Sequence, residues 1–188
     1  MIGLASMSPR RRELLEQINV YYRQIVVNVD ETPLAEETPE DYVTRLALAK
    51  ARAGRLATQS AYPILGADTA VVVQGLVLGK PVDAADAQFM LTQLSGRTHQ
   101  VMSAIAVVTP VLERSCISIS QVHFRSLTAA EIEAYVATGE PLDKAGAYAI
   151  QGRGSIFIEH LQGSYSGVMG LPLYETATLL SAVGITLL

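Results

Sequence analysis

The chain has 188 residues, of which 49% are hydrophobic and 17% are charged, and its formal net charge is −4 at pH 7. This length and composition predict a single globular domain over residues 1–188 and exclude a largely disordered chain. The negative charge disfavours a general nucleic-acid-binding protein, because such proteins usually present a broad basic surface. The single cysteine, Cys116, excludes an internal disulfide and is typical of a reducing compartment.

The sequence predicts neither a signal peptide nor a membrane-spanning helix. The apolar stretch at the start of the chain is too short for the core of a signal peptide, because it is interrupted by Ser6 and Arg10. The longest apolar runs have the length of strands, so no transmembrane helix is expected. We therefore expect a cytoplasmic protein without a membrane partner.

In chain order, the first predicted elements are a buried strand over residues 2–5 and a helix over residues 9–18. Ser8 occupies the expected N-cap position and Pro9 the first helical position. Three cations follow in the first turn: Arg10, Arg11 and Arg12. The helix dipole favours carboxylates there, so these cations are unfavourable unless an anion binds beside them. With Ser6 nearby they predict an anion-binding site, to which phosphate oxygens would be well matched, and the alternative is that they extend into solvent.

A second strand is predicted over residues 22–29, and an acidic turn leads from it to a long helix. Thr38 is the expected cap of this helix and Pro39 its first residue. Four residues at helical spacing form its predicted apolar stripe: Val43, Leu46, Ala53 and Ala57. Lys50 falls within the stripe, where a lysine most often extends its ammonium group to the surface.

The rest of the chain alternates strands and helices without a strict βαβ rhythm. Strands are expected over residues 63–73, 76–81, 99–109, 114–126 and 155–161. Helices are expected over residues 83–94 and 129–138 and in the second half of 163–184. This order predicts an α/β fold in which helices flank a mixed sheet.

Asp68 is the most unusual residue of the predicted strands. A carboxylate inside an apolar strand is costly unless it is paired, bound to a metal or facing a cleft. The period of two places Gly66, Asp68 and Ala70 on one face, and these small neighbours leave room for a ligand. Asp68 and the acidic turn at Asp30 and Glu31 could supply oxygen ligands for Mg²⁺. The alternatives are a buried arginine that pairs with Asp68 and an acidic turn that is only solvated.

The remaining polar residues carry little information singly. Lys80 and Lys144 lie in loops marked by glycine and proline, where binding groups are common but idle lysines are common too. His99, His123 and His160 lack the spacing of metal ligands. The sequence contains no phosphate-binding glycine loop and no nucleophile elbow.

Nine segments, taken together and in this order, resemble the Maf family of nucleotide pyrophosphatases over nearly the whole chain. They are ASMSPRRRELL (5–15), DE (30–31), RLALAKA (45–51), LGADT (65–69), LGKP (78–81), LSGRTHQV (94–101), VHFR (122–125), EPLDKAGAYAIQG (140–152) and GSYSGVMGLPL (163–173). The resemblance implies hydrolysis of nucleoside triphosphates to the monophosphate and pyrophosphate, with Mg²⁺ or Mn²⁺ as cofactor. It also implies an elongated mixed sheet flanked by helices, with a central cleft, related to the inosine-triphosphate pyrophosphatases.

The resemblance assigns roles to particular positions. Asp68 matches the proton acceptor and is expected to be catalytic together with Lys80, and Glu31 and Asp68 are the expected metal ligands. The expected substrate-binding residues are Ser6, Ser8, Arg10, Arg11, Lys50, Thr69, Lys80 and Gln151. Three of these positions track substrate choice in the family, and their occupants here resemble the branch that acts on dTTP and UTP: Arg10, Thr69 and Gln151. Arg12 is expected to be solvated.

Two other classes of function remain open at this point. One is a nucleotide-binding regulator, in line with the family's association with septum formation and cell division. The other is a nucleic-acid-binding module, which the net charge of −4, the absence of tryptophan and the 6% of aromatic residues disfavour. The expected partners are a nucleoside triphosphate and, in a homodimer, a second copy of the chain.

Overall fold

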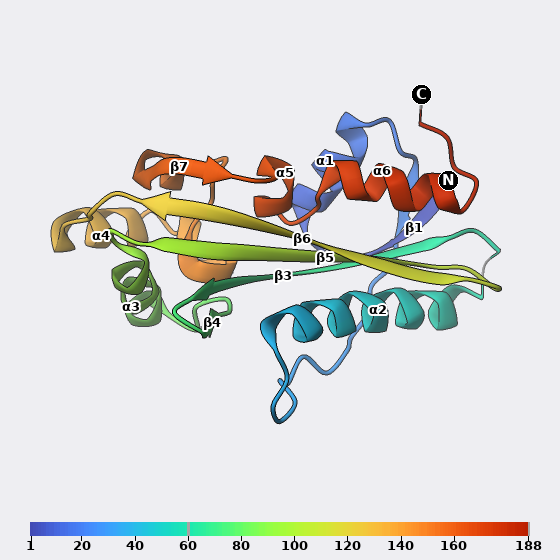
Figure 1. The fold of residues 1–188 in the computed structure, drawn as a ribbon, viewed down its shortest axis with the longest axis horizontal. Coiled ribbons are helices and arrows are strands. Elements are labelled where there is room, and N and C mark those ends of the chain that lie inside the picture. Colours follow the sequence, from blue (N-terminus) through green and yellow to red (C-terminus); the bar gives the residue numbers. More distant parts are fainter. Residues whose placement is uncertain (60, 188) are drawn as a thin grey trace. The chain divides into compact units, whose positions relative to one another are not determined.

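The computed structural model describes residues 1–59 and 61–187, which form two compact units (Figure 1). Unit 1 contains Met1–Asp68, Ser103–Ser118 and the chain from Gly170 onward, and unit 2 contains Thr69–Met102 and Ile119–Met169. Three long strands contribute to both units: β3 (Ile64–Val73), β5 (Thr98–Val108) and β6 (Glu113–Phe124). Each unit is therefore assembled from segments that are distant in the sequence. The single domain over residues 1–188 stays a prediction.

The predicted α/β class with a mixed sheet is confirmed. The strands form one seven-stranded sheet in the order β2-β1-β3-β5-β6-β7, and β4 pairs with β3. β1 is parallel to β2 and β3, whereas β4 is antiparallel to β3 and β7 is antiparallel to β6. The four shorter strands are β1 (Ile2–Ala5), β2 (Tyr22–Gln24), β4 (Leu76–Leu78) and β7 (Ile158–Gln162).

Unit 1 places α2 (Pro39–Thr58) against the sheet, with α1 (Pro9–Gln17) and α6 (Leu173–Ala182) as its other helices (Figure 1). The close approach of α2 depends on a glycine of β3. A Cβ atom added to Gly66 would lie 2.3 Å from the carbonyl oxygen of Ala47 and 2.6 Å from the amide nitrogen of Ala51. The room that the sequence pattern attributed to a ligand at this point is therefore occupied by the backbone of α2.

The buried face of α2 differs from the predicted stripe at its C-terminal end. Its buried residues are Val43, Leu46, Ala47, Ala51 and Gly54. Ala53 is only half-buried and Ala57 is exposed, so the stripe prediction is wrong for these two alanines. The prediction of Thr38 as the cap is confirmed, because its side chain accepts a hydrogen bond from the amide of Asp41 at 3.2 Å.

Unit 2 contains the helices α3 (Ala84–Leu94), α4 (Ala129–Val136) and α5 (Tyr165–Val168) and three 3₁₀ helices. The 3₁₀ helices are η1 (Glu140–Asp143), η2 (Ala145–Ala147) and η3 (Arg153–Phe157). The core of this unit is apolar and aromatic, and Phe124 packs edge-on against Tyr148 and Phe157 within it. Thr128 and Glu131 form a capping box at the start of α4, as the predicted cap required.

Three predicted strands are shorter or displaced, and one of them, predicted over 76–81, ends at Leu78. The strand predicted over 22–29 ends at Gln24, because its partner β1 has only four residues and the pairing ends at Leu4 and Gln24. The strand predicted over 155–161 begins at Ile158 instead. The carboxylate of Glu140 accepts hydrogen bonds from the amides of Arg153 and Gly154, and these residues open η3 rather than a strand.

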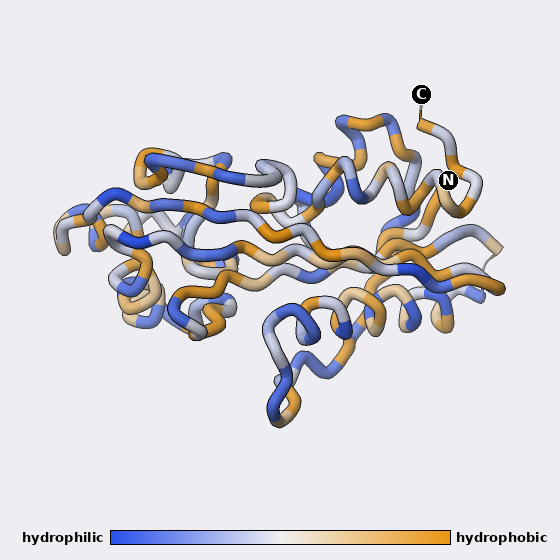
Figure 2. The backbone as a smooth tube through the Cα atoms, viewed as in Figure 1, coloured by the Kyte–Doolittle hydropathy of each residue, from blue (hydrophilic) through white to orange (hydrophobic). Residues whose placement is uncertain are grey.

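The hydropathy of the chain is low in an exposed loop of unit 1. Figure 2 shows the segment that precedes α2 as mainly hydrophilic, in agreement with its sequence DETPLAEET over residues 30–38. In the part of the chain that the structure describes, no helix combines the length and the apolar character needed to cross a membrane.

His99 is a buried histidine in the core of unit 2. Its Nε2 atom lies 2.9 Å from the hydroxyl oxygen of Tyr148, and its ring packs edge-on against Phe124 at a centroid distance of 5.0 Å. Burial lowers the pKa of His99 to about 4. The imidazole is therefore neutral in the folded protein at pH 7.

We expect this histidine to make the folded protein less stable in mild acid. Between pH 6.5 and 4 the unfolded chain binds a proton at His99 and the folded protein does not, so stability falls as the pH falls through this window. The loss approaches about 3 kcal/mol near pH 4, from a pKa difference of two to three units. Urea unfolding at several pH values should show a shallower dependence for His99→Gln than for the unmodified chain. Equal dependences would contradict the assignment.

Candidate active site

Lys50 of α2 lies between two carboxylates of unit 1. Its Nζ atom is 2.6 Å from Oδ1 of Asp68 and 2.6 Å from Oε1 of Glu31. The side chains of Lys50 and Asp68 are 14% and 11% exposed, whereas that of Glu31 is 56% exposed. Three segments thus bring one cation and two anions together: the strand β3, the helix α2 and the loop that follows β2. The ion pair of Asp68 is with Lys50, and the buried Arg11 also acts electrostatically on this carboxyl group.

The electrostatic state of Asp68 follows from this setting. Burial raises the pKa of Asp68 above its ordinary value, while Lys50 and Arg11 oppose this rise. A carboxylate with a raised pKa holds a proton more readily, which suits a group that accepts a proton during a reaction near neutral pH.

The start of α1 holds the predicted anion site. Nη1 of Arg11 donates to the hydroxyl of Ser6 at 3.2 Å, and Nε of Arg11 donates to the carbonyl oxygen of Gly170 at 2.8 Å. The amide of Ser8 also donates to the hydroxyl of Ser6, at 3.2 Å. Burial lowers the pKa of Arg11, and the charges of Asp68 and Glu31 oppose this effect. Arg11 therefore lies within electrostatic range of both carboxylates.

The capping of α1 is weaker than that of α2. Ser8 occupies the N-cap position, as predicted, but its side chain makes no capping hydrogen bond, and the first turn has no acidic residue. Arg10 is half-buried. The first turn of α1 therefore carries three cations, with neither a carboxylate of its own nor a capping side chain from Ser8.

Arg12 differs from the expectation of a solvated side chain. It is half-buried, and its Nη1 atom donates to the side-chain oxygen of Gln24 at 3.2 Å. Nε2 of Gln24 in turn donates to the backbone oxygen of Ser6 at 3.0 Å. In the sequence, Gln24 is marked only as a polar residue within a predicted strand, and nothing there indicates its contact with Arg12.

Three predicted site residues belong to unit 2. Thr69 follows Asp68 on β3 and is half-buried, while Lys80 and Gln151 are exposed. The loop that carries Lys80 is attached within its own unit, because the amide of Gly146 donates to the carbonyl oxygen of Gly79 at 3.0 Å. The substrate-binding roles of these three residues, and the catalytic role of Lys80, stay predictions.

Glu31 and Asp68 provide the oxygen atoms that a divalent cation would need. Among the described residues, no group of three or more His, Cys, Asp or Glu side chains is placed to hold a metal ion. Two carboxylates close to each other nevertheless match the requirement of Mg²⁺ when substrate phosphates and water complete its shell. In this structure the ammonium of Lys50 lies between the two carboxylates, so a metal ion would bind beside it, through carboxylate oxygens other than those that contact Lys50.

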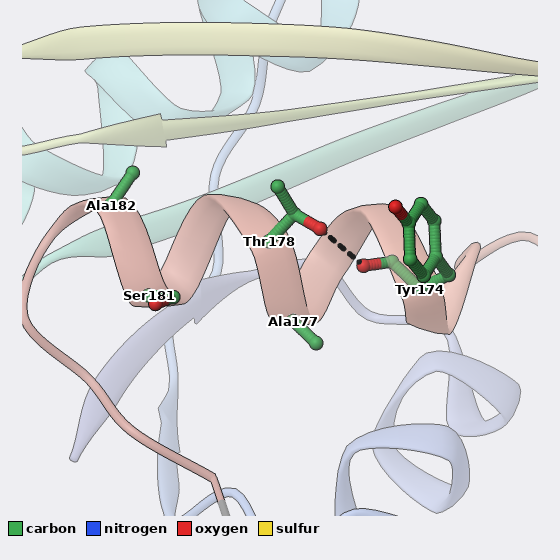
Figure 3. Close-up of a pocket in the computed structure, with 5 residues that line it drawn as sticks. All are labelled: Tyr174, Ala177, Thr178, Ser181 and Ala182. Atoms are coloured by element: carbon green, nitrogen blue, oxygen red, sulfur yellow. Dashed lines mark hydrogen bonds between the residues drawn. The ribbon is translucent and has the colours of Figure 1, made fainter.

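A separate surface cavity of about 530 Å³ lies over α6 (Figure 3). Five residues of this single helix line it: Tyr174, Ala177, Thr178, Ser181 and Ala182. None of the five is charged, and none is a predicted site residue. The cavity therefore lacks the cations that binding of a triphosphate requires.

One family model matches nearly the whole chain. The model of the family described as Maf-like protein matches residues 1–183. The chain belongs to this family. The match extends over both units, so the residues of the candidate site and those of unit 2 lie within the matched Maf region.

Relatives with curated names are similar over nearly their whole length. A protein of Aromatoleum aromaticum is 54% identical over 196 residues, which cover 97% of this chain and 95% of that protein. A protein of Xanthomonas axonopodis pv. citri is 52% identical and covers 98% of this chain and 99% of its own length. A protein of Salmonella typhimurium is 52% identical, with coverages of 95% and 90%. All three are named dTTP/UTP pyrophosphatase.

Among solved structures, a HAM1 protein from Coxiella burnetii has a similar fold. The TM-score is 0.53 at 19% sequence identity, and the match covers 96% of this chain and 98% of that one. At this identity the likeness concerns the fold alone.

We expect Lys50→Met to destabilise this Maf-like chain by about 3 kcal/mol at pH 7, because it leaves the buried carboxylate of Asp68 without its cation. The loss should shrink as the pH falls, since the pKa of Asp68 rises further without Lys50 and protonation removes the buried charge. Urea unfolding at pH 5 and pH 8 measures both effects.

Two further variants control this experiment. Arg52 lies on the same helix as Lys50 and forms an exposed ion pair with Glu113 of β6. Arg52→Met removes this pair and should lower the stability by less than about 1 kcal/mol. The double variant Lys50→Met/Asp68→Asn should recover stability relative to Lys50→Met at pH 8. A double variant that is no more stable would show that the charge of Asp68 is not the cause.

Proposed function

We propose that this chain hydrolyses nucleoside triphosphates, dTTP and UTP in particular, to the nucleoside monophosphate and pyrophosphate. The observation that carries the proposal is the buried carboxylate of Asp68, 2.6 Å from the ammonium of Lys50, which Glu31 also contacts. The names of relatives at 52–54% identity support the choice of substrates.

In this proposal Asp68 accepts a proton from the attacking water. The water oxygen bonds to the α-phosphorus, the bond from that phosphorus to the α,β-bridging oxygen breaks, and pyrophosphate leaves with the electron pair. Burial raises the pKa of Asp68, and this brings its basicity closer to that needed near neutral pH. Lys50 holds the carboxylate in place by its contact with Oδ1.

The cations of unit 1 bind the phosphates. A nucleoside triphosphate carries about four negative charges, and the chain itself has a net charge of −4, so binding depends on a local cluster of cations. Arg10 and Arg11 provide it at the start of α1, with the hydroxyls of Ser6 and Ser8 beside them. Because charge develops on the leaving oxygen, cations fixed before the reaction stabilise the transition state more than the ground state.

Residues of unit 2 complete the proposed set. Lys80 contributes a further cation, and Thr69 and Gln151 offer donors and acceptors to a pyrimidine edge. Support for these three roles comes from the positions that match the Maf family. The proposed preference for dTTP and UTP rests on three residues: Arg10, Thr69 and Gln151.

Glu31 and Asp68 are the proposed ligands of a divalent cation. When bound there, Mg²⁺ or Mn²⁺ supplies positive charge for the phosphates and makes a bound water more acidic. The closeness of the two carboxylates, which lie on either side of Lys50 in unit 1, supports this assignment. We further propose that the enzyme works in the cytoplasm, where nucleoside triphosphates are available.

The products of hydrolysis test the proposal directly. With Mg²⁺ or Mn²⁺, dTTP and UTP should yield pyrophosphate and the monophosphate faster than the other common nucleoside triphosphates. Orthophosphate as the first product would contradict attack at the α-phosphorus. Binding of the nucleotide without release of either product would instead favour the alternative of a nucleotide-binding regulator of septum formation.

Asp68→Asn tests the proposed base. We expect the variant to fold, since an amide keeps the size of the side chain, and to lose about 100- to 10,000-fold in turnover. Release of pyrophosphate from dTTP provides the rate, and circular dichroism verifies the fold. Glu133→Gln, which changes an exposed carboxylate of α4, is the matched control and should keep its full rate. Near-normal turnover by Asp68→Asn would remove Asp68 from the catalytic role.

A further inference from the structure

Glu31 lies in a segment that has no regular structure of its own. Residues 25–38 form neither helix nor strand, and the side chain of Glu31 is 56% exposed. Its carboxylate nevertheless lies 2.6 Å from the ammonium of Lys50. An exposed ion pair of this kind is too weak to hold a loop in place by itself, so other contacts have to fix the backbone of Glu31.

Tyr42, in the first turns of α2, makes one such contact. Its hydroxyl donates a hydrogen bond to the backbone oxygen of Glu31 at 2.9 Å. The ring is half-buried, and the pKa of Tyr42 is raised by burial and, to a lesser extent, by the negative charges of Asp68 and Glu31. The phenol therefore remains a hydrogen-bond donor at neutral pH.

Arg45, one helical turn further on, makes the next contacts with the same loop. Its Nη2 atom donates to the backbone oxygen of Thr32 at 3.2 Å. Its Nε and Nη2 atoms also donate to the two carboxylate oxygens of Glu37, at 2.5 and 2.7 Å. Glu37 in turn accepts from the amide of Leu34 at 3.0 Å, so one guanidinium group holds both ends of the turn.

The two side chains also contact each other. The guanidinium carbon of Arg45 lies 5.6 Å from the centre of the Tyr42 ring, within the range of a cation–π interaction. They hold the carbonyl groups of two consecutive residues, Glu31 and Thr32. The helix that carries them also carries Lys50, so α2 supplies both the cation and the attachment of the loop.

We propose that Tyr42 and Arg45 are positioning residues that hold the carboxylate of Glu31 beside Lys50 and Asp68. Their part in turnover rests on the proposed function. Neither side chain touches the reacting atoms in this proposal, because both act through the backbone of the loop. Their effect is to order Glu31 before substrate binds, so that less ordering is left to be done during the reaction.

A double-mutant cycle with Glu31 distinguishes this role from a general structural one. Tyr42→Phe removes one hydrogen bond and should lower kcat/KM for dTTP about five-fold, as expected for one neutral hydrogen bond. In the Glu31→Gln background the same change should alter kcat/KM by less than about two-fold, since the group that it positions is then absent.

Tyr21→Phe is the matched control. Tyr21 belongs to unit 1 and is 82% exposed, and we expect its loss of a hydroxyl to leave the rate unchanged. An equal loss for Tyr42→Phe in the unmodified chain and in the Glu31→Gln background would overturn the proposal, because Tyr42 would then act independently of Glu31.

Hydrogen exchange provides a readout that does not depend on activity. In the nucleotide-free protein, Tyr42→Phe and Arg45→Met should speed the exchange of amides in residues 30–37 at least several-fold, and Tyr21→Phe should not. Unchanged exchange in both variants would overturn the proposal. If the unmodified chain releases no pyrophosphate, the proposed function fails, and faster exchange at residues 30–37 still supports the attachment of the loop by Tyr42 and Arg45.

Discussion

The ammonium group of Lys50 is the interaction on which the rest of the candidate site depends. It satisfies the buried carboxylate of Asp68 on β3 and reaches the exposed carboxylate of Glu31 at the same distance, 2.6 Å. A buried carboxylate without a cation costs several kcal/mol, so the fold tolerates Asp68 only where α2 delivers a lysine to it. The same contact that makes Asp68 tolerable leaves its pKa raised by burial, which is the property that a base requires.

The position of Lys50 is in turn set by backbone contact. Gly66 lies two residues before Asp68 on the same face of β3, and it presents no side chain to α2. Any larger residue there would collide with the backbone of Ala47 and Ala51, on either side of Lys50 in the sequence. The helix can therefore approach the strand closely enough for a lysine side chain to end at Asp68. The close contact between Gly66 and α2 therefore sets the position of the Lys50 ammonium group.

The cations at the start of α1 show how the fold compensates an unfavourable charge. Arginines in a first turn oppose the helix dipole, and Ser8 provides no capping hydrogen bond. Arg11 is stabilised from outside the helix, by the hydroxyl of Ser6 and by the carbonyl oxygen of Gly170 near the other end of the chain. The charges of Asp68 and Glu31 favour its protonated form as well. The arginine side chain of the predicted anion site is thus held in place by contacts that the helix itself does not supply.

By itself the sequence determined the features that depend on neighbouring residues, namely the starts of helices and the residues that are costly without a partner. Caps such as Thr38 and Thr128 located the starts of helices, and the buried acid at Asp68 and the arginines of α1 marked the candidate site, because each is costly without a partner. Only the tertiary structure decided how long β2 is, which alanines of α2 are buried, and that residues 153–157 form a 3₁₀ helix, because distant partners set each of these. It also decided that Lys50 is the partner of Asp68 and that Tyr42 and Arg45 hold the loop of Glu31. Such pairs come from separate segments, and no periodicity within one segment records which of them meet.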